Sequence, residues 1–101
     1  MVPMAKYNAE SSQASATERF LRQQGLDHIR VRKHGAVLNL ESGPADAAIK
    51  HARLRRVSVN YWTLEMATHM GRWERTGLRD TRDNLLASLV RDYSWSLTPV
   101  E

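Results

Sequence analysis

Cysteine is absent from the 101 residues of the chain. Disulfides, thiolate metal sites and cysteine nucleophiles are therefore excluded, and the lack of disulfides fits a reducing compartment. Long hydrophobic runs are absent too, since none approaches the ~20 residues of a membrane-spanning helix. The N-terminal segment 1–16 lacks the apolar stretch that follows the basic start of a secretory signal. We therefore expect a cytoplasmic protein with no membrane partner.

Motifs for nucleotide binding and for hydrolysis are also missing. The sequence has no G-x-x-x-x-G-K-[ST], no G-x-G-x-x-G and no G-x-S-x-G. Its four histidines, His28, His34, His51 and His69, do not fall at metal-ligand spacing, and H-E-x-x-H does not occur. We expect no metal, no small-molecule cofactor, and a binding protein rather than an enzyme.

The composition is that of one ordinary globular domain. Apolar residues make up 42% and charged residues 26% of a chain that is too short for two independent cores. Residues 1–14 are polar and without period, and we expect them to form a flexible N-terminal tail. Residues 15–101 are expected to form a single domain.

Positive charge is concentrated in the middle of the chain. The formal net charge is +4, and residues 28–58 alone carry seven basic residues against Glu41 and Asp46. A localised positive field attracts phosphates or an acidic partner. The alternative interpretation is a solvated edge that only keeps the protein soluble. The candidate nucleic-acid-binding residues are Arg30, Arg32, Lys33, Lys50, Arg53, Arg55 and Arg56.

Two helices are predicted, one near each end of the sequence. The first begins at a capping box, in which Ser15 and Glu18 satisfy each other's backbone amides, and ends near Gly25. The second begins at Asp80, with apolar residues following at helical spacing. That apolar stripe consists of Leu85, Leu86, Leu89, Val90 and Tyr93.

The segment 28–41 predicts a β-hairpin. Its apolar and polar residues alternate on both sides of a turn that we place at His34 and Gly35. Arg30 and Arg32 then lie on the face opposite the aliphatic side chains. Those aliphatic residues are Ile29, Val31, Leu38 and Leu40.

A second hairpin is predicted further along the chain. One strand runs from about Arg55 through Met66, residues 69–71 form the turn, and residues 72–76 return as the other strand. The segment 45–52 is compatible with a short helix or a loop. The predicted fold is therefore an α+β two-layer sandwich, in which a four-stranded antiparallel sheet of two hairpins has two helices on one face.

The order of these elements is similar in topology to the double-stranded RNA-binding domain, which is built as α, β, β, β, α. Such domains use a lysine-rich start of the second helix on phosphates. Here that segment is RDTRDN, in which Asp80 and Asp83 would repel a nucleic-acid backbone. The similarity does not extend to the residues that bind duplex RNA.

Three functions remain open at this stage. The first is a small basic module that binds RNA or DNA through the open sheet face and the segment 50–56, with Trp62 and Trp73 as stacking platforms if they are exposed. The second is a non-enzymatic homodimeric interaction or assembly protein. The third is a small ribonuclease-like enzyme, in which His69 would act beside Glu65 and Glu74.

Overall fold

The computed structural model describes residues 7–68 and 70–97. Its elements follow in the order α1 (Ser11–Gln23), β1 (Arg30–His34), β2 (Val37–Ser42), the 3-10 helix η1 (Ala45–Ala47), β3 (Ile49–Arg56), β4 (Trp62–Ala67), β5 (Trp73–Asp80), α2 (Arg82–Asp92) and the 3-10 helix η2 (Ser94–Leu97). The antiparallel sheet with two helices confirms the predicted α+β class.

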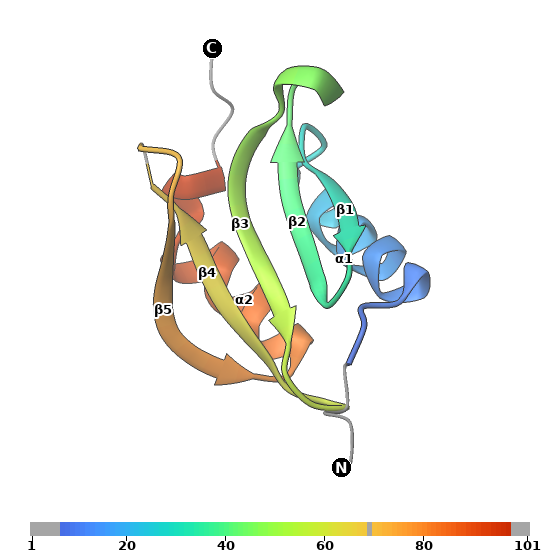
Figure 1. The fold of residues 1–101 in the computed structure, drawn as a ribbon. Coiled ribbons are helices and arrows are strands. Elements are labelled where there is room, and N and C mark those ends of the chain that lie inside the picture. The colour runs from blue at the N-terminus through green and yellow to red at the C-terminus, as the bar shows by residue number, and fades with distance from the viewer. Residues whose placement is uncertain (1–6, 69, 98–101) are drawn as a thin grey trace.

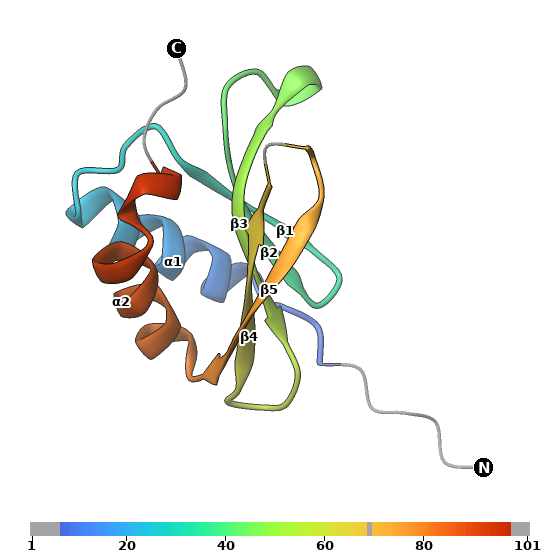
Figure 2. The same cartoon turned by 90° about the vertical axis from the view of Figure 1, so that its left-hand side faces the viewer.

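The sheet is an antiparallel meander of five strands in the order β1-β2-β3-β4-β5, so the prediction of four strands was wrong. Figure 1 shows this order across the sheet. Both helices lie on the same side of the sheet in Figure 2, with α1 near β1 and α2 near β4 and β5. The opposite side of the sheet has no helix among the described residues.

The additional strand is β3, whose first half comes from the segment 45–52 that was compatible with a short helix or a loop. A bulge interrupts its alternation, because Leu40 lies opposite Ala52 whereas Glu41 lies opposite Lys50. His51 is therefore the extra residue of the bulge. The second predicted hairpin also begins later than expected, since residues 57–61 connect two strands and β4 starts at Trp62.

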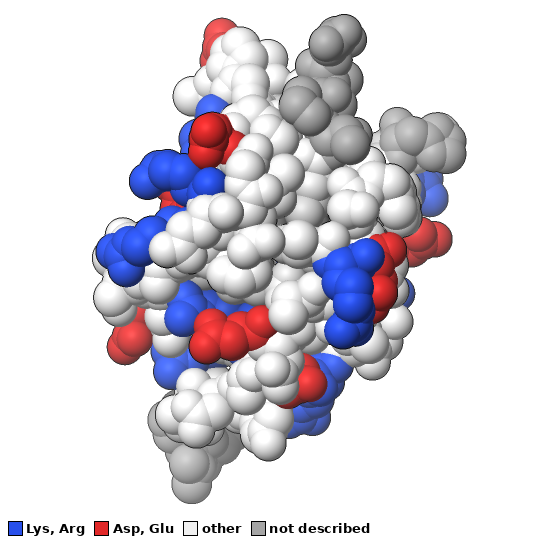
Figure 3. Space-filling model, turned by 180° about the vertical axis from the view of Figure 1, so that it is seen from behind, with Lys and Arg blue, Asp and Glu red and all other residues white. Residues whose placement is uncertain are grey.

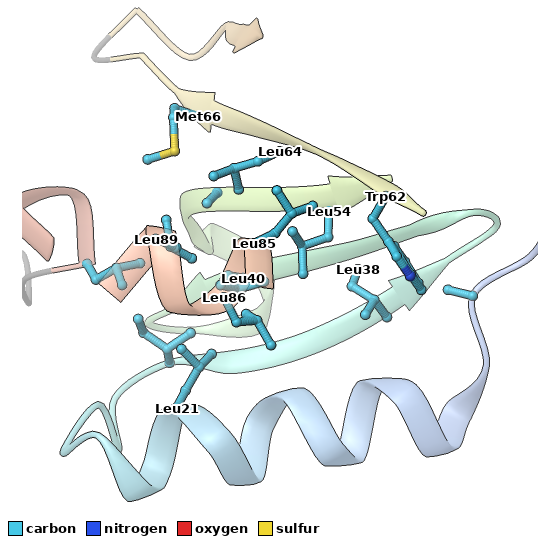
Figure 4. Packing of buried hydrophobic residues seen from close by; sticks show 14 residues of the cluster. Leu21, Leu38, Leu40, Leu54, Trp62, Leu64, Met66, Leu85, Leu86 and Leu89 are labelled. Atoms are coloured by element: carbon cyan, nitrogen blue, oxygen red, sulfur yellow. The ribbon is translucent and has the colours of Figure 1, made fainter. Parts of the chain in front are cut away.

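Leucines from the sheet and from both helices form the core. Leu38, Leu54 and Leu64 lie directly opposite one another on three neighbouring strands, and all three are almost completely buried. Figure 4 shows this row pointing toward Leu85 and its neighbours on α2. Full burial of one such side chain contributes roughly 1.5–3 kcal/mol. This packing determines which face of each strand is buried against the helices and which face is directed away from them.

The first hairpin is confirmed, but its turn lies one residue later than predicted. His34 pairs with Val37, so Gly35 and Ala36 form the turn. Gly35 has a φ of 58° in the first central position, as in a type II′ turn. Val31 consequently pairs with Leu40 rather than Leu38. Because each partner moves by two residues, every side chain keeps its predicted face.

Both helices begin at residues other than the predicted caps. Helix α1 begins at Ser11 and not after Ser15, because Glu10 and Gln13 form the capping box. Residues 11–14 thus belong to the helix rather than to a tail. Helix α2 is capped by Thr81, whose hydroxyl accepts from the Asn84 amide. No helix among the described residues has the length and apolar character needed to cross a membrane.

Candidate functional site

The register of the sheet determines which charged side chains share its uncovered face, since directly opposed residues point the same way. Arg53 lies opposite Asn39 on one neighbouring strand and opposite Glu65 on the other. Arg75 in turn lies opposite Glu65. We call this surface the basic face: its cations are Arg30, Arg32, Lys50, Arg53, Arg55, Arg75 and Arg79, and its carboxylates are Glu41 and Glu65.

The two carboxylates of the basic face lie beneath arginine side chains. Glu41 is only 2% exposed and Glu65 only 6%, although no helix of residues 7–68 and 70–97 covers them. Arg32 donates to Glu41 through Nε at 3.1 Å and Nη2 at 3.0 Å. Arg53 and Arg55 each donate to a different oxygen of Glu65, at 2.9 Å and 3.3 Å. The carboxylates therefore hold three guanidinium groups in defined positions.

These contacts keep both carboxylates ionised. The hydrogen bond from Arg32 lowers the pKa of Glu41, against the opposing effect of burial. Burial alone would raise the pKa of Glu65, but the hydrogen bond and charge of Arg53, together with Arg55, lower it overall. The basic face thus carries seven cations and two anions at neutral pH.

Trp73 is the tryptophan of the basic face. Its ring lies 4.3 Å from the guanidinium carbon of Arg53 and 5.9 Å from the Lys50 ammonium. The side chain is half-buried, so part of it stays accessible. Trp62, by contrast, is 2% exposed and belongs to the core. Of the two predicted stacking platforms, only Trp73 lies in a position to serve as one.

Five of the seven predicted site residues converge on the basic face, and two do not. Lys33 lies opposite Leu38 and therefore shares the helix side of β1. Arg56 lies opposite Trp62, packs on its ring and donates to the backbone oxygens of Asn8 and Val59. The five that converge are Arg30, Arg32, Lys50, Arg53 and Arg55.

Arg75 and Arg79 also belong to the basic face but were not among the predicted site residues. Thr63 lies opposite Arg79 and Glu65 opposite Arg75, so β5 has an irregularity between these pairs. Gly77, with a φ of 82°, lies within it. The signal in the sequence was their spacing of four residues, which places both side chains on one face of a strand, and the irregularity shifts the pairing by two residues and so preserves that face.

The helix side of the molecule has a different charge pattern. Figure 3, which shows the molecule from this side, has basic and acidic side chains next to each other and an uncharged middle. Arg22 pairs with Glu18 on α1, and Arg91 pairs with Asp92 on α2. These pairs place positive and negative charges next to each other on the helix side.

The predicted ribonuclease-like grouping is not assembled by the described residues. His69 lies outside them. Glu65 is held by Arg53 and Arg55 on the basic face, whereas Glu74 lies opposite the buried Met66 on the other side of the sheet. Within 7–68 and 70–97, no group of three or more histidine or acidic side chains is placed to hold a metal ion.

Comparison with protein-family models, curated proteins and solved structures gives no match for this chain. The residues of the basic face are therefore the basis for any functional interpretation.

Proposed function

We propose that the protein binds single-stranded nucleic acid, RNA or DNA, on the basic face. The observation that carries the proposal is the convergence of seven cations and one accessible tryptophan on the sheet face that neither α1 nor α2 covers. Phosphate contacts need cations on an accessible surface, and guanidinium groups and indole rings also stack on bases.

The shape of the surface favours a single strand over a duplex. Reading a duplex usually requires a helix or a ribbon that enters a groove. Helices α1 and α2 are both on the opposite side of the sheet (Figure 2). A sheet face with an aromatic side chain instead suits unstacked bases laid across the strands.

The buried carboxylates support this proposal. Exposed arginine side chains lose conformational entropy when a ligand orders them. On the basic face, Glu65 has already positioned Arg53 and Arg55, and Arg55 is still 43% exposed. Arg32 is 56% exposed while it is paired with Glu41. The guanidinium groups are thus oriented in advance and remain accessible to phosphate.

A homodimer formed through this face is less favourable. A two-fold contact would bring the seven cations of one copy against the same seven of another, and like charges across an interface are repulsive. Gel filtration at low and high salt separates the two functions. A dimer peak that does not change with salt or added nucleic acid would favour assembly.

The direct test measures the affinity for a single-stranded oligonucleotide of about 12 nucleotides without terminal phosphates. Fluorescence anisotropy gives the dissociation constant at each concentration of a salt series. Lys50 and Arg75 are exposed and form no ion pair with described residues, so their replacement leaves the carboxylate contacts intact. The double variant Lys50→Gln/Arg75→Gln should bind about tenfold more weakly. Its salt slope should fall by about 1.4, since each lost phosphate contact contributes about 0.7.

The matched control removes two positive charges from the other side of the molecule. Arg19 on α1 and Lys33 on β1 are both exposed. The double variant Arg19→Gln/Lys33→Gln has the same net charge as Lys50→Gln/Arg75→Gln and should bind within about twofold of the wild type. Equal loss in the two double variants would mean that only net charge matters, and the proposed site would be wrong.

A further inference from the structure

A hollow opens at the end of the basic face where β3 and β4 separate. The pairing of these strands ends at Ala52 and Met66, so residues 49–51 have no partner on β4 among the described residues. Figure 1 shows the two strands diverging at this end. The hollow has a volume of about 590 Å³, within the range of ~300–1,000 Å³ that is typical of ligand sites.

The wall of the hollow combines cations, an aromatic ring and hydroxyl groups. Lys50 comes from β3, Arg72 and Trp73 come from the start of β5 and the turn before it, and Thr68 and Ser96 contribute hydroxyls. Its remaining lining residues are Ala48, Ile49, His51, Ala67 and Gly71. No lining residue is acidic, and neither Lys50 nor Arg72 forms an ion pair with a described residue.

Other hollows of the described surface combine each cation with a carboxylate. Arg75 lines one together with Glu74. Arg82 lines another together with Asp83. Glu18 accompanies the two arginines of a third. The hollow between β3 and β4 differs from these in having two cations and no carboxylate among its lining residues.

We propose that this hollow binds the phosphorylated terminal nucleotide of a strand that lies on the basic face. The inference rests on the proposed function, because the strand is delivered by that face. Lys50 and Trp73 belong to both surfaces, so a strand that follows the basic face toward this end reaches the hollow without leaving the protein.

The chemistry of a strand end explains the choice of ligand. A terminal phosphomonoester carries a charge of about −1.5 to −2 at neutral pH, whereas each internal phosphodiester carries about −1. Two cations in a hollow that no carboxylate lines match the larger charge. Trp73 offers a ring to the terminal base, and the hydroxyls of Thr68 and Ser96 lie on the wall as further donors.

The experiment compares oligonucleotides of one sequence that carry a 5′-phosphate, a 3′-phosphate or no terminal phosphate. The wild type should bind one phosphorylated form about tenfold more tightly than the unphosphorylated form. Arg72→Gln should abolish this preference and change binding of the unphosphorylated form by less than about twofold, because Arg72 lies in the hollow and outside the basic face.

Arg79→Gln is the matched control. Arg79 is exposed, lies on the same strand as Trp73 and contacts Tyr61 at the other end of the sheet. This variant should weaken all three oligonucleotides alike and keep the preference for a phosphorylated end. Loss of the preference in Arg79→Gln as well would overturn the assignment of the hollow.

Two further outcomes separate this inference from the proposed function. If the wild type binds all three oligonucleotides equally, the hollow does not bind a strand end, while the proposed function stands. If no oligonucleotide binds but a nucleoside monophosphate binds the wild type and not Arg72→Gln, the proposed function fails. The hollow then binds the phosphomonoester of a free nucleotide, and the claim that a bound strand supplies this group is wrong.

Discussion

Strand β3 contributes to both faces of the sheet, and its two sets of side chains are held by different forces. Leu54 points to the helix side, where it is fully buried among other leucines. Arg53 and Arg55, its neighbours in sequence, point to the basic face and contact Glu65. The comparison shows that the basic face, on which neither α1 nor α2 packs, can bury a carboxylate nearly as deeply as the core buries leucine. The condition is that guanidinium groups lie over the carboxylate.

The largest effect should come from the helix side. Leu54→Ala removes a fully buried side chain from the centre of the sheet, and we expect a loss of about 3 kcal/mol in the free energy of unfolding. Urea denaturation followed by tryptophan fluorescence measures this. Arg55→Ala, one position along β3, is the control and should cost less than about 1 kcal/mol. Similar losses in the two variants would contradict the division between the faces.

An intermediate effect is expected from the basic face. Arg53→Met removes one of the two partners of Glu65, which is 6% exposed. We expect a loss of about 1–2 kcal/mol at pH 7, because hydrogen bonds to buried charged groups contribute more than neutral ones. The pKa of Glu65 is lowered in the folded protein, so its contribution is present above pH ~4.5 and is lost as the pH falls below this value.

The same pH dependence supplies the control for Arg53→Met. The difference in unfolding free energy between wild type and variant should be largest at pH 7 and should shrink as the pH falls below ~4.5, because the stability that depends on an ionised Glu65 is lost there. Glu65→Gln combined with Arg53→Met should recover part of the loss at pH 7. A difference that stays constant with pH would show that Arg53 acts through packing on Trp73 instead.

The sequence predicted those parts of the fold that depend on alternation over several residues. The faces of the first hairpin were correct even though its turn was misplaced, because a shift of two residues preserves the alternation. Strand β3 was missed for the opposite reason. Its bulge at His51 breaks the period of two, and the run KHARLRR then keeps a strand alternation only over residues 52–55.

The candidate site could be predicted only in part. Local charge density identified Arg53 and Arg55, and the hairpin pattern identified Arg30 and Arg32. The burial of Glu41 and Glu65 was not predictable, because each depends on arginines contributed by neighbouring positions and neighbouring strands. Arg56 was also predicted for the site, and it lies outside the basic face, because it is opposite Trp62 and contacts its ring.

The smallest expected effect concerns His51, at the bulge where β3 turns a polar side chain toward the helix side. Its Nε2 lies 2.7 Å from the Ser42 hydroxyl and its Nδ1 lies 2.8 Å from the Ser96 carbonyl of η2. Burial lowers the pKa of His51, and the adjacent His28 lowers it further, against the raising effect of the Ser96 carbonyl. A neutral imidazole fits these contacts, with Nδ1–H donating to Ser96 and Nε2 accepting from Ser42.

Because this pKa is lower in the folded than in the unfolded chain, the unfolded chain takes up more protons as the pH falls. The stability that His51 supports is complete above pH ~6.5 and declines below it. We expect the Tm of the wild type to fall by a few degrees more than that of His51→Gln between pH 7.5 and 5.5, in a thermal scan by circular dichroism. Glutamine can still donate to Ser96 and accept from Ser42, so the variant should fold. If the Tm of His51→Gln falls by as much as that of the wild type, the pH dependence comes from other titrating groups. His51 then makes no pH-dependent contribution to the stability of the helix side.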